Sequence, residues 1–108
     1  MELYYTPQAE KDLVNIRESI LEKFYDEELA KRVLRQITRS IRRLQTFPYS
    51  GQELSAITGI QNEYRVLFCQ KNYVFYRVEN DTLRIIRILN EKQDYMRILF
   101  GISETEEM

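Results

Sequence analysis

Apolar residues in the first part of the chain recur every three or four positions, which predicts a helix with one buried face. Thr6 is a favourable N-cap and Pro7 suits the first helical position. The helix is therefore expected from about Pro7 to Phe24. Its apolar stripe consists of Ala9, Leu13, Ile16, Ile20 and Phe24.

A second helix is predicted from Asp26, which can cap it, to the Phe47-Pro48-Tyr49-Ser50-Gly51 turn. Because the connection to the first helix is so short, the two should form an antiparallel hairpin. The apolar stripe of the second helix is Leu29, Val33, Ile37, Ile41 and Leu44. Its other side carries Lys31, Arg32, Arg35, Arg39, Arg42 and Arg43. Such a basic face either touches nucleic acid or is simply solvated.

The apolar period changes from 3.6 to 2 after residue 63, which is typical of strands. Three consecutive strands are predicted for EYRVLFC, YVFYRVE and LRIIRIL, with tight turns at Lys71-Asn72 and Asn80-Asp81. ELYYT predicts a further strand at the start of the chain. Residues 52–61 are expected to form a polar loop, and the segment from Asp94 to Gly101 a short strand or a helical turn.

The predicted fold class is α+β, in the order β-α-α-β-β-β. A small antiparallel sheet should carry the helix hairpin on one face, leaving the other face open or closed only by the chain end. We expect a single domain over residues 1–101 and an acidic tail over residues 102–108. The tail either screens a basic surface or is a solubilising end.

Composition excludes several kinds of chemistry. The chain has no histidine and one cysteine, Cys69. Imidazole acid–base catalysis, Ser-His-Asp and Cys-His sites and an internal disulfide are therefore excluded. We expect no cofactor and no metal site. The chain lacks an apolar run of membrane-spanning length and a signal-peptide pattern, so we expect a cytoplasmic protein without membrane contact.

Basic residues are frequent on the predicted strands and beyond them, and tyrosines lie among them. Arginine forks suit phosphates, and tyrosines can stack on bases or donate a hydroxyl group. The same residues could equally be edge charges and core tyrosines. The residues concerned are Arg65, Arg77, Arg84, Arg87, Lys92, Tyr95 and Arg97.

The ordered combination of these segments resembles the RelE/ParE toxin superfamily of bacterial type II toxin–antitoxin modules, and its ParE branch most closely. The resemblance is carried by TPQAEKDLVNI, the FPYSGQEL loop, EYRVLF, YVFYRVEND and LRIIRILNEKQDYMRIL. It implies a toxin held inactive by a cognate antitoxin in a hetero-oligomer. ParE-like members poison DNA gyrase, whereas RelE-like members cut mRNA on the ribosome.

The resemblance also implies where nuclease residues would lie. Arg65 matches a catalytic lysine and Tyr95 the late tyrosine of the nucleases, and Lys92 falls near their late basic residue. Leu67 and Val74 replace two further basic positions. Many relatives have histidine where this chain has Asn90.

Three hypotheses follow from the sequence. The first is a ParE-like inhibitor of DNA gyrase, which would act through a protein contact. Arg77, Arg84 and Arg97 are expected to bind the target or a nucleic acid. The second is an endoribonuclease acting on ribosome-bound mRNA through Arg65, Arg87, Lys92 and Tyr95. The third is a non-toxic binding module of the same fold. For all three, the antitoxin is expected on the helix hairpin and the sheet edge. Leu13, Ile16, Ile37 and Ile41 could contribute to this contact, but they are expected to serve the core first.

Overall fold

The computed structural model describes residues 1–102; residues 103–108, which contain the acidic part of the expected tail, lie outside the described residues. The strands are β1 (Glu2–Tyr5), β2 (Gln52–Glu53), β3 (Arg65–Cys69), β4 (Asn72–Glu79) and β5 (Thr82–Asn90). The helices are α1 (Pro7–Phe24), α2 (Glu27–Leu44), α3 (Leu54–Thr58) and α4 (Tyr95–Phe100).

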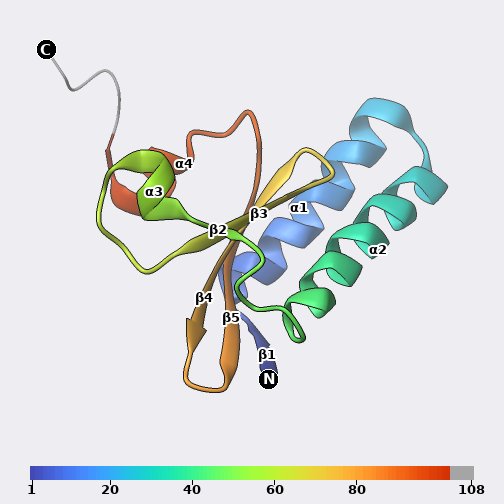
Figure 1. Ribbon diagram of the computed structural model, residues 1–108. Coiled ribbons are helices and arrows are strands. Elements are labelled where there is room, and N and C mark those ends of the chain that lie inside the picture. Colours follow the sequence, from blue (N-terminus) through green and yellow to red (C-terminus); the bar gives the residue numbers. More distant parts are fainter. Residues whose placement is uncertain (103–108) are drawn as a thin grey trace, which may run out of the picture.

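The two long helices form the predicted antiparallel hairpin (Figure 1). The hydroxyl oxygen of Thr6 accepts a hydrogen bond from the Ala9 N–H at 3.0 Å, and Asp26 Oδ1 accepts one from the Leu29 N–H at 3.0 Å. Both caps satisfy N–H groups that the first turn of a helix leaves without partners. The predicted bounds of α1 and the predicted cap of α2 are confirmed.

The sheet has the strand order β1-β5-β4-β3-β2, with the β3-β4-β5 meander at its centre (Figure 1). The pairs within the meander are antiparallel, as predicted, but β1 runs parallel to β5. The sheet is therefore mixed rather than wholly antiparallel. The long connection from β1 through both helices and the meander allows this parallel pairing.

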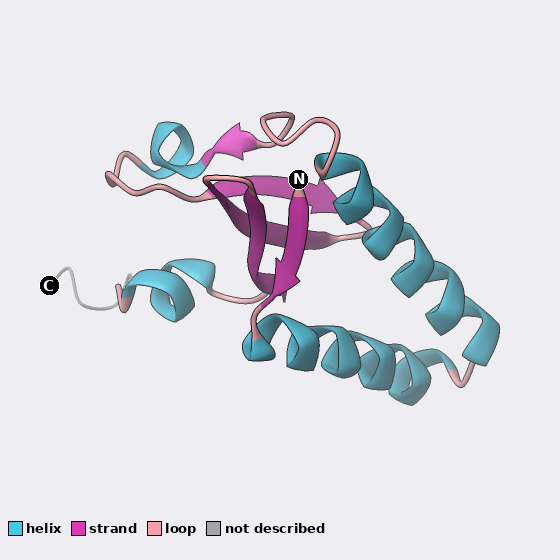
Figure 2. Cartoon of the chain, turned by 90° about the horizontal axis from the view of Figure 1, so that it is seen from below, coloured by secondary structure: helices cyan, strands magenta, loops and turns pink. Residues whose placement is uncertain are grey.

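Two apolar clusters pack on opposite faces of the sheet. On one face, Val74, Tyr76 and Ile85 pack with Ile37 and Ile41 of the helix hairpin. On the other face, Phe75 and Leu89 are covered by partly buried residues of α4 and by Leu54 of α3. α4 thus covers part of the second face, on the side of the sheet away from the hairpin (Figure 2).

Two predictions about loops need correction. Residues 52–61 are not simply a polar loop, because β2 extends the sheet and α3 buries Leu54. The first hairpin turn lies one residue earlier than expected: Gln70 and Lys71 have φ of 52° and 63°, and Asn72 already pairs with Cys69. Neither glutamine nor lysine is a usual turn residue at positive φ, which is why the pattern favoured the asparagine.

Candidate functional site

Arg87, a predicted site residue, is held by a buried carboxylate. Its Nε and Nη2 donate hydrogen bonds to the two oxygens of Asp12, each at 2.9 Å, and Asp12 Oδ2 also accepts the Ile88 N–H at 2.8 Å. These hydrogen bonds raise the pKa of Arg87. β1 pairs with β5 only as far as Ile85, so Asp12 satisfies the edge of β5 beyond the end of β1. Asp12 is only 6% exposed.

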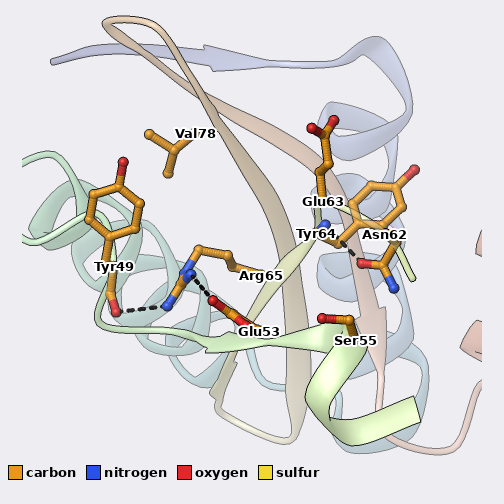
Figure 3. Close-up of a pocket in the computed structure, with 8 residues that line it drawn as sticks. All are labelled: Tyr49, Glu53, Ser55, Asn62, Glu63, Tyr64, Arg65 and Val78. Atoms are coloured by element: carbon orange, nitrogen blue, oxygen red, sulfur yellow. Dashed lines mark hydrogen bonds and ion pairs between the residues drawn. The ribbon is translucent and has the colours of Figure 1, made fainter. Parts of the chain in front are cut away.

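Arg65, the second predicted catalytic residue, lines a small pocket of about 230 Å³ (Figure 3). Its Nη2 donates hydrogen bonds to the carbonyl oxygens of Tyr49 at 3.1 Å and Gly51 at 2.8 Å. Its Nη1 lies 3.6 Å from Glu53, and its guanidinium lies over the Tyr49 ring. Arg65 therefore fastens the 49–53 segment to the sheet. The pocket is lined by Tyr49, Glu53, Ser55, Asn62, Glu63, Tyr64, Arg65 and Val78.

Tyr76 also holds the 49–53 segment and the neighbouring Pro48 in place, through two hydrogen bonds of its hydroxyl group. Its hydroxyl group donates a hydrogen bond to the Pro48 carbonyl at 2.8 Å and accepts one from the Gly51 N–H at 3.0 Å. Burial raises the pKa of Tyr76, against the smaller opposing effects of Gly51 and Arg65. A Cβ at Gly51 would lie 2.5 Å from the Tyr76 hydroxyl oxygen and 2.8 Å from the Val66 carbonyl oxygen, so only glycine fits there.

Arg77 and Arg84 lie directly opposite each other on β4 and β5. Glu79 bridges them, with Oε2 at 2.9 Å from Arg77 Nη2 and Oε1 at 2.8 Å from Arg84 Nε. The Arg84 guanidinium also lies over the Tyr4 ring, 4.6 Å from its centroid, and Arg77 pairs with Glu63 at 3.1 Å. We call Arg77, Glu79, Arg84 and Tyr4 the arginine patch.

The remaining predicted residues belong to the chain end. The Tyr95 ring packs on Phe75 and Tyr73, with centroid distances of 5.2 and 5.5 Å. The exposed Lys92 lies in the turn before α4, where its N–H donates to Asn90 Oδ1 at 3.0 Å. Arg97 is an exposed residue of α4 that lies 3.9 Å from Asp94.

The four predicted nuclease residues do not form one constellation. In the register of β3 and β4, Arg65 lies opposite Tyr76, whose side chain is on the face covered by the helix hairpin. Tyr95 packs on Phe75, whose side chain is on the other face. Residues opposite each other on neighbouring strands project to the same side of a sheet, so Arg65 and Tyr95 lie on different sides. The guanidinium groups of Arg65 and Arg87 are both engaged by structural partners. A concerted acid–base role for these residues has no geometric support within residues 1–102.

An apolar groove lies where β1 meets the helix hairpin. Its volume is about 540 Å³, and its walls are Leu3, Tyr5, Glu10, Leu13, Val14, Thr38 and Arg42. Of the four residues predicted to bind an antitoxin, Leu13 lines this groove. Ile16 packs partly buried against the core, and Ile37 and Ile41 are 0% exposed. The last two therefore serve the core and present no surface to a partner in this conformation.

Sequence reasoning missed three residues that organise these surfaces. Asp12 looked like any charged residue of an amphipathic helix, and Glu79 like the end of a strand. Nothing in the spacing of Gly51 indicated its contact with Tyr76, although glycine after a helix-ending Pro-Tyr-Ser turn suggests a constrained backbone.

Comparison with known proteins identifies the class of molecule. Residues 3–95 match the family model described as the ParE toxin of the type II toxin–antitoxin system parDE. The chain therefore belongs to the ParE toxin family, and the predicted membership of the RelE/ParE superfamily is confirmed. The matched segment ends at Tyr95, where α4 begins.

A solved structure of the chromosomal ParDE toxin–antitoxin system from P. aeruginosa shares the fold. The TM-score is 0.71 at 22% sequence identity, and the match covers 83% of this chain and 95% of that chain. The search of curated proteins gave no match. Within residues 1–102, no helix has both the length and the apolar character needed to cross a membrane.

Proposed function

We propose that this ParE-family toxin inhibits DNA gyrase through a protein–protein contact and is neutralised by an antitoxin bound beside its helix hairpin. The observation that carries the proposal is the separation of Arg65 and Tyr95 onto opposite sides of the sheet in a chain that belongs to the ParE family. Acid–base cleavage of a phosphodiester needs its groups within hydrogen-bonding reach of one reacting centre. A toxin that acts by binding has no such requirement.

The arginine patch is our proposed contact with gyrase. Two arginines directly opposite each other on a sheet repel, and Glu79 offsets this repulsion in the free protein. A carboxylate on a partner could replace Glu79 at either guanidinium. Tyr4 is 43% exposed beside Arg84 and supplies an aromatic anchor, and arginine and tyrosine are enriched at energetically important interface positions. Arg97 is not included in this contact, because its ion pair within residues 1–102 is with Asp94 of its own helix end rather than with the patch.

The groove between β1 and the hairpin is our proposed antitoxin site. Its lining includes the apolar side chains of Leu3, Leu13 and Val14 and the charged side chains of Glu10 and Arg42. An apolar groove with a few polar groups suits the apolar face of a peptide segment. Of the four residues predicted to contact the antitoxin, Leu13 is the one that lines this groove.

Plasmid topology in cells tests the proposed target. Induction of the toxin without antitoxin should reduce the negative supercoiling of a reporter plasmid before growth stops, because gyrase alone introduces negative supercoils. Arg77→Gln/Arg84→Gln should leave topology unchanged, whereas the exposed control Arg17→Gln/Lys23→Gln should behave like the wild type. Growth arrest with normal plasmid topology would rule out gyrase as the target.

A further inference from the structure

The outer face of α2 carries a continuous basic stripe. Its six basic side chains are all exposed, and no acidic residue occurs between positions 29 and 52. The net charge of the whole chain is −1, so the stripe does not reflect a basic protein in general. We define the α2 stripe as Lys31, Arg32, Arg35, Arg39, Arg42 and Arg43.

Helical geometry aligns these residues into two neighbouring rows. With 3.6 residues per turn, Arg32, Arg39 and Arg43 fall within an arc of about 40°. Lys31, Arg35 and Arg42 form the adjacent row. Together the rows cover about a third of the helix circumference and extend about 18 Å along its axis. Ile37, Ile41 and Leu44 are buried on the opposite side of the helix, so the stripe faces away from the core. Arg42, at one edge of the stripe, also lines the groove beside β1.

The charges of the stripe are almost uncompensated. Of the six residues, only Lys31 forms an ion pair within residues 1–102, with Glu28 at 4.0 Å. Figure 2 shows α2 along the outer margin of the molecule, with no other described element beyond it. A cluster of like charges held on a rigid helix repels itself, and this repulsion is relieved when a polyanion binds.

We propose that the α2 stripe binds the phosphate backbone of duplex DNA without reading its sequence. Five of the six residues are arginines, whose guanidinium forks form bidentate hydrogen bonds with phosphate oxygens. A B-form major groove is about 12 Å wide and admits one α-helix, so two rows of arginine on one helix can reach phosphates on both sides. The stripe contains no apolar residue, whereas the centre of a protein interface is usually apolar.

This inference rests on the proposed function in one respect: gyrase works on duplex DNA, so DNA would be a second contact of the toxin. The DNA contact can nevertheless be tested separately from gyrase inhibition. Binding of the purified full-length toxin to a labelled duplex of about 20 base pairs can be measured by fluorescence anisotropy at several salt concentrations. Arg32→Gln/Arg39→Gln/Arg43→Gln should weaken binding at least about tenfold near 0.1 M salt. It should also reduce the slope of log K against log salt concentration by about 3.

Matched variants separate the stripe from overall charge. Lys11→Gln/Arg17→Gln/Lys23→Gln removes three exposed positive charges elsewhere and should change affinity less than about twofold. Arg32→Lys/Arg39→Lys/Arg43→Lys keeps the charges and should retain most of the binding, and circular dichroism checks that each variant is folded.

Several outcomes would overturn the proposal. These are no DNA binding by the wild type, an equal loss in both glutamine triples, or equally tight binding to polyglutamate. Tighter binding to an RNA duplex than to DNA would overturn the assignment of DNA. If the α2 glutamine triple inhibits gyrase normally and wild-type DNA binding is absent, this inference fails while the proposed function survives.

Discussion

Asp12 and Arg87 are 75 positions apart in the chain and form a two-bonded ion pair that joins α1 to β5. The carboxylate is buried and also accepts a hydrogen bond from the Ile88 N–H. It thereby replaces the backbone partner that β1 does not provide, because β1 pairs with β5 only as far as Ile85. The arginine is thereby turned toward the helix hairpin. A residue that the sequence presented as a candidate for catalysis thus has a clear structural role.

Removing either partner should destabilise the protein strongly. Asp12→Ala should lower the free energy of unfolding by about 3 kcal/mol, because it leaves the Arg87 guanidinium and the Ile88 N–H without their partner. Arg87→Ala should lower the free energy of unfolding by a similar amount. The loss in the double variant should be clearly smaller than the sum of the two single losses. Urea unfolding measures all three.

Arg17→Ala is the control for that series, since Arg17 and Glu27 form an exposed pair at 3.3 Å. It should cost less than about 1 kcal/mol. If the double variant lost as much free energy of unfolding as Asp12→Ala and Arg87→Ala together, the two residues would not be coupled, and the proposed ion pair would be contradicted.

The Tyr76 hydroxyl group should contribute to stability in a pH-dependent way. Tyr76→Phe removes hydrogen bonds to Pro48 and Gly51 and should cost about 2 kcal/mol at neutral pH. Burial raises the pKa of Tyr76, so the folded state holds this proton more tightly than the unfolded state does. Its contribution is therefore complete below the ordinary tyrosine pKa of about 10 and is lost as pH rises from there through the folded pKa.

Urea titrations at pH 7 and above pH 10 check this prediction. The wild type should lose more stability than Tyr76→Phe over this range. Tyr25→Phe, which alters a side chain that is 89% exposed, should resemble the wild type at both values. Identical pH profiles for the wild type and Tyr76→Phe would contradict the assignment.

Much of the fold could be predicted from the sequence because helix caps and apolar periods are local signals. Thr6, Pro7 and Asp26 placed the helix starts, and alternation placed the three strands of the meander. β2 and α3 could not be predicted in the same way, since two strand residues and one helical turn carry almost no periodicity. Leu54 followed by Gly59 at a left-handed C-cap was the only hint of α3.

The candidate site was harder to predict because it depends on partners distant in sequence. Alternation shows that Arg77 and Arg84 occupy strands, but only the register places them opposite each other with Glu79 between them. The bulge near Phe75 and Tyr76 shifts the pairing of Arg87, which simple alternation could not anticipate. The burial of Ile37 and Ile41, in contrast, was expected from their positions in the apolar face of the second helix, and it leaves them no surface for an antitoxin.

A charge introduced into the groove should impair neutralisation by the antitoxin. Val14 is 53% exposed and lines the groove, so Val14→Arg should fold normally but weaken antitoxin binding at least about tenfold. Asn15→Arg adds the same charge at the next exposed position, which is not a groove residue, and should bind normally. Titration calorimetry gives the affinities. Equal binding by both variants would place the antitoxin elsewhere.

The ribonuclease alternative makes a different prediction for the chain end. Primer extension on ribosome-bound mRNA should show no cleavage by the wild-type toxin, and Tyr95→Phe and Lys92→Gln should still arrest growth. The reason is that the Tyr95 ring packs on Phe75, a contact that phenylalanine preserves, away from the Arg65 face. Cleavage by the wild type that falls at least tenfold in Tyr95→Phe would restore the nuclease hypothesis.

The most direct test of the proposed function is supercoiling of relaxed plasmid by purified gyrase in the presence of increasing toxin. We predict that the wild type inhibits supercoiling, that Arg77→Gln/Arg84→Gln requires at least about tenfold more protein for the same effect, and that Arg17→Gln/Lys23→Gln matches the wild type. Unimpaired supercoiling at saturating concentrations of folded, antitoxin-free toxin would contradict the account.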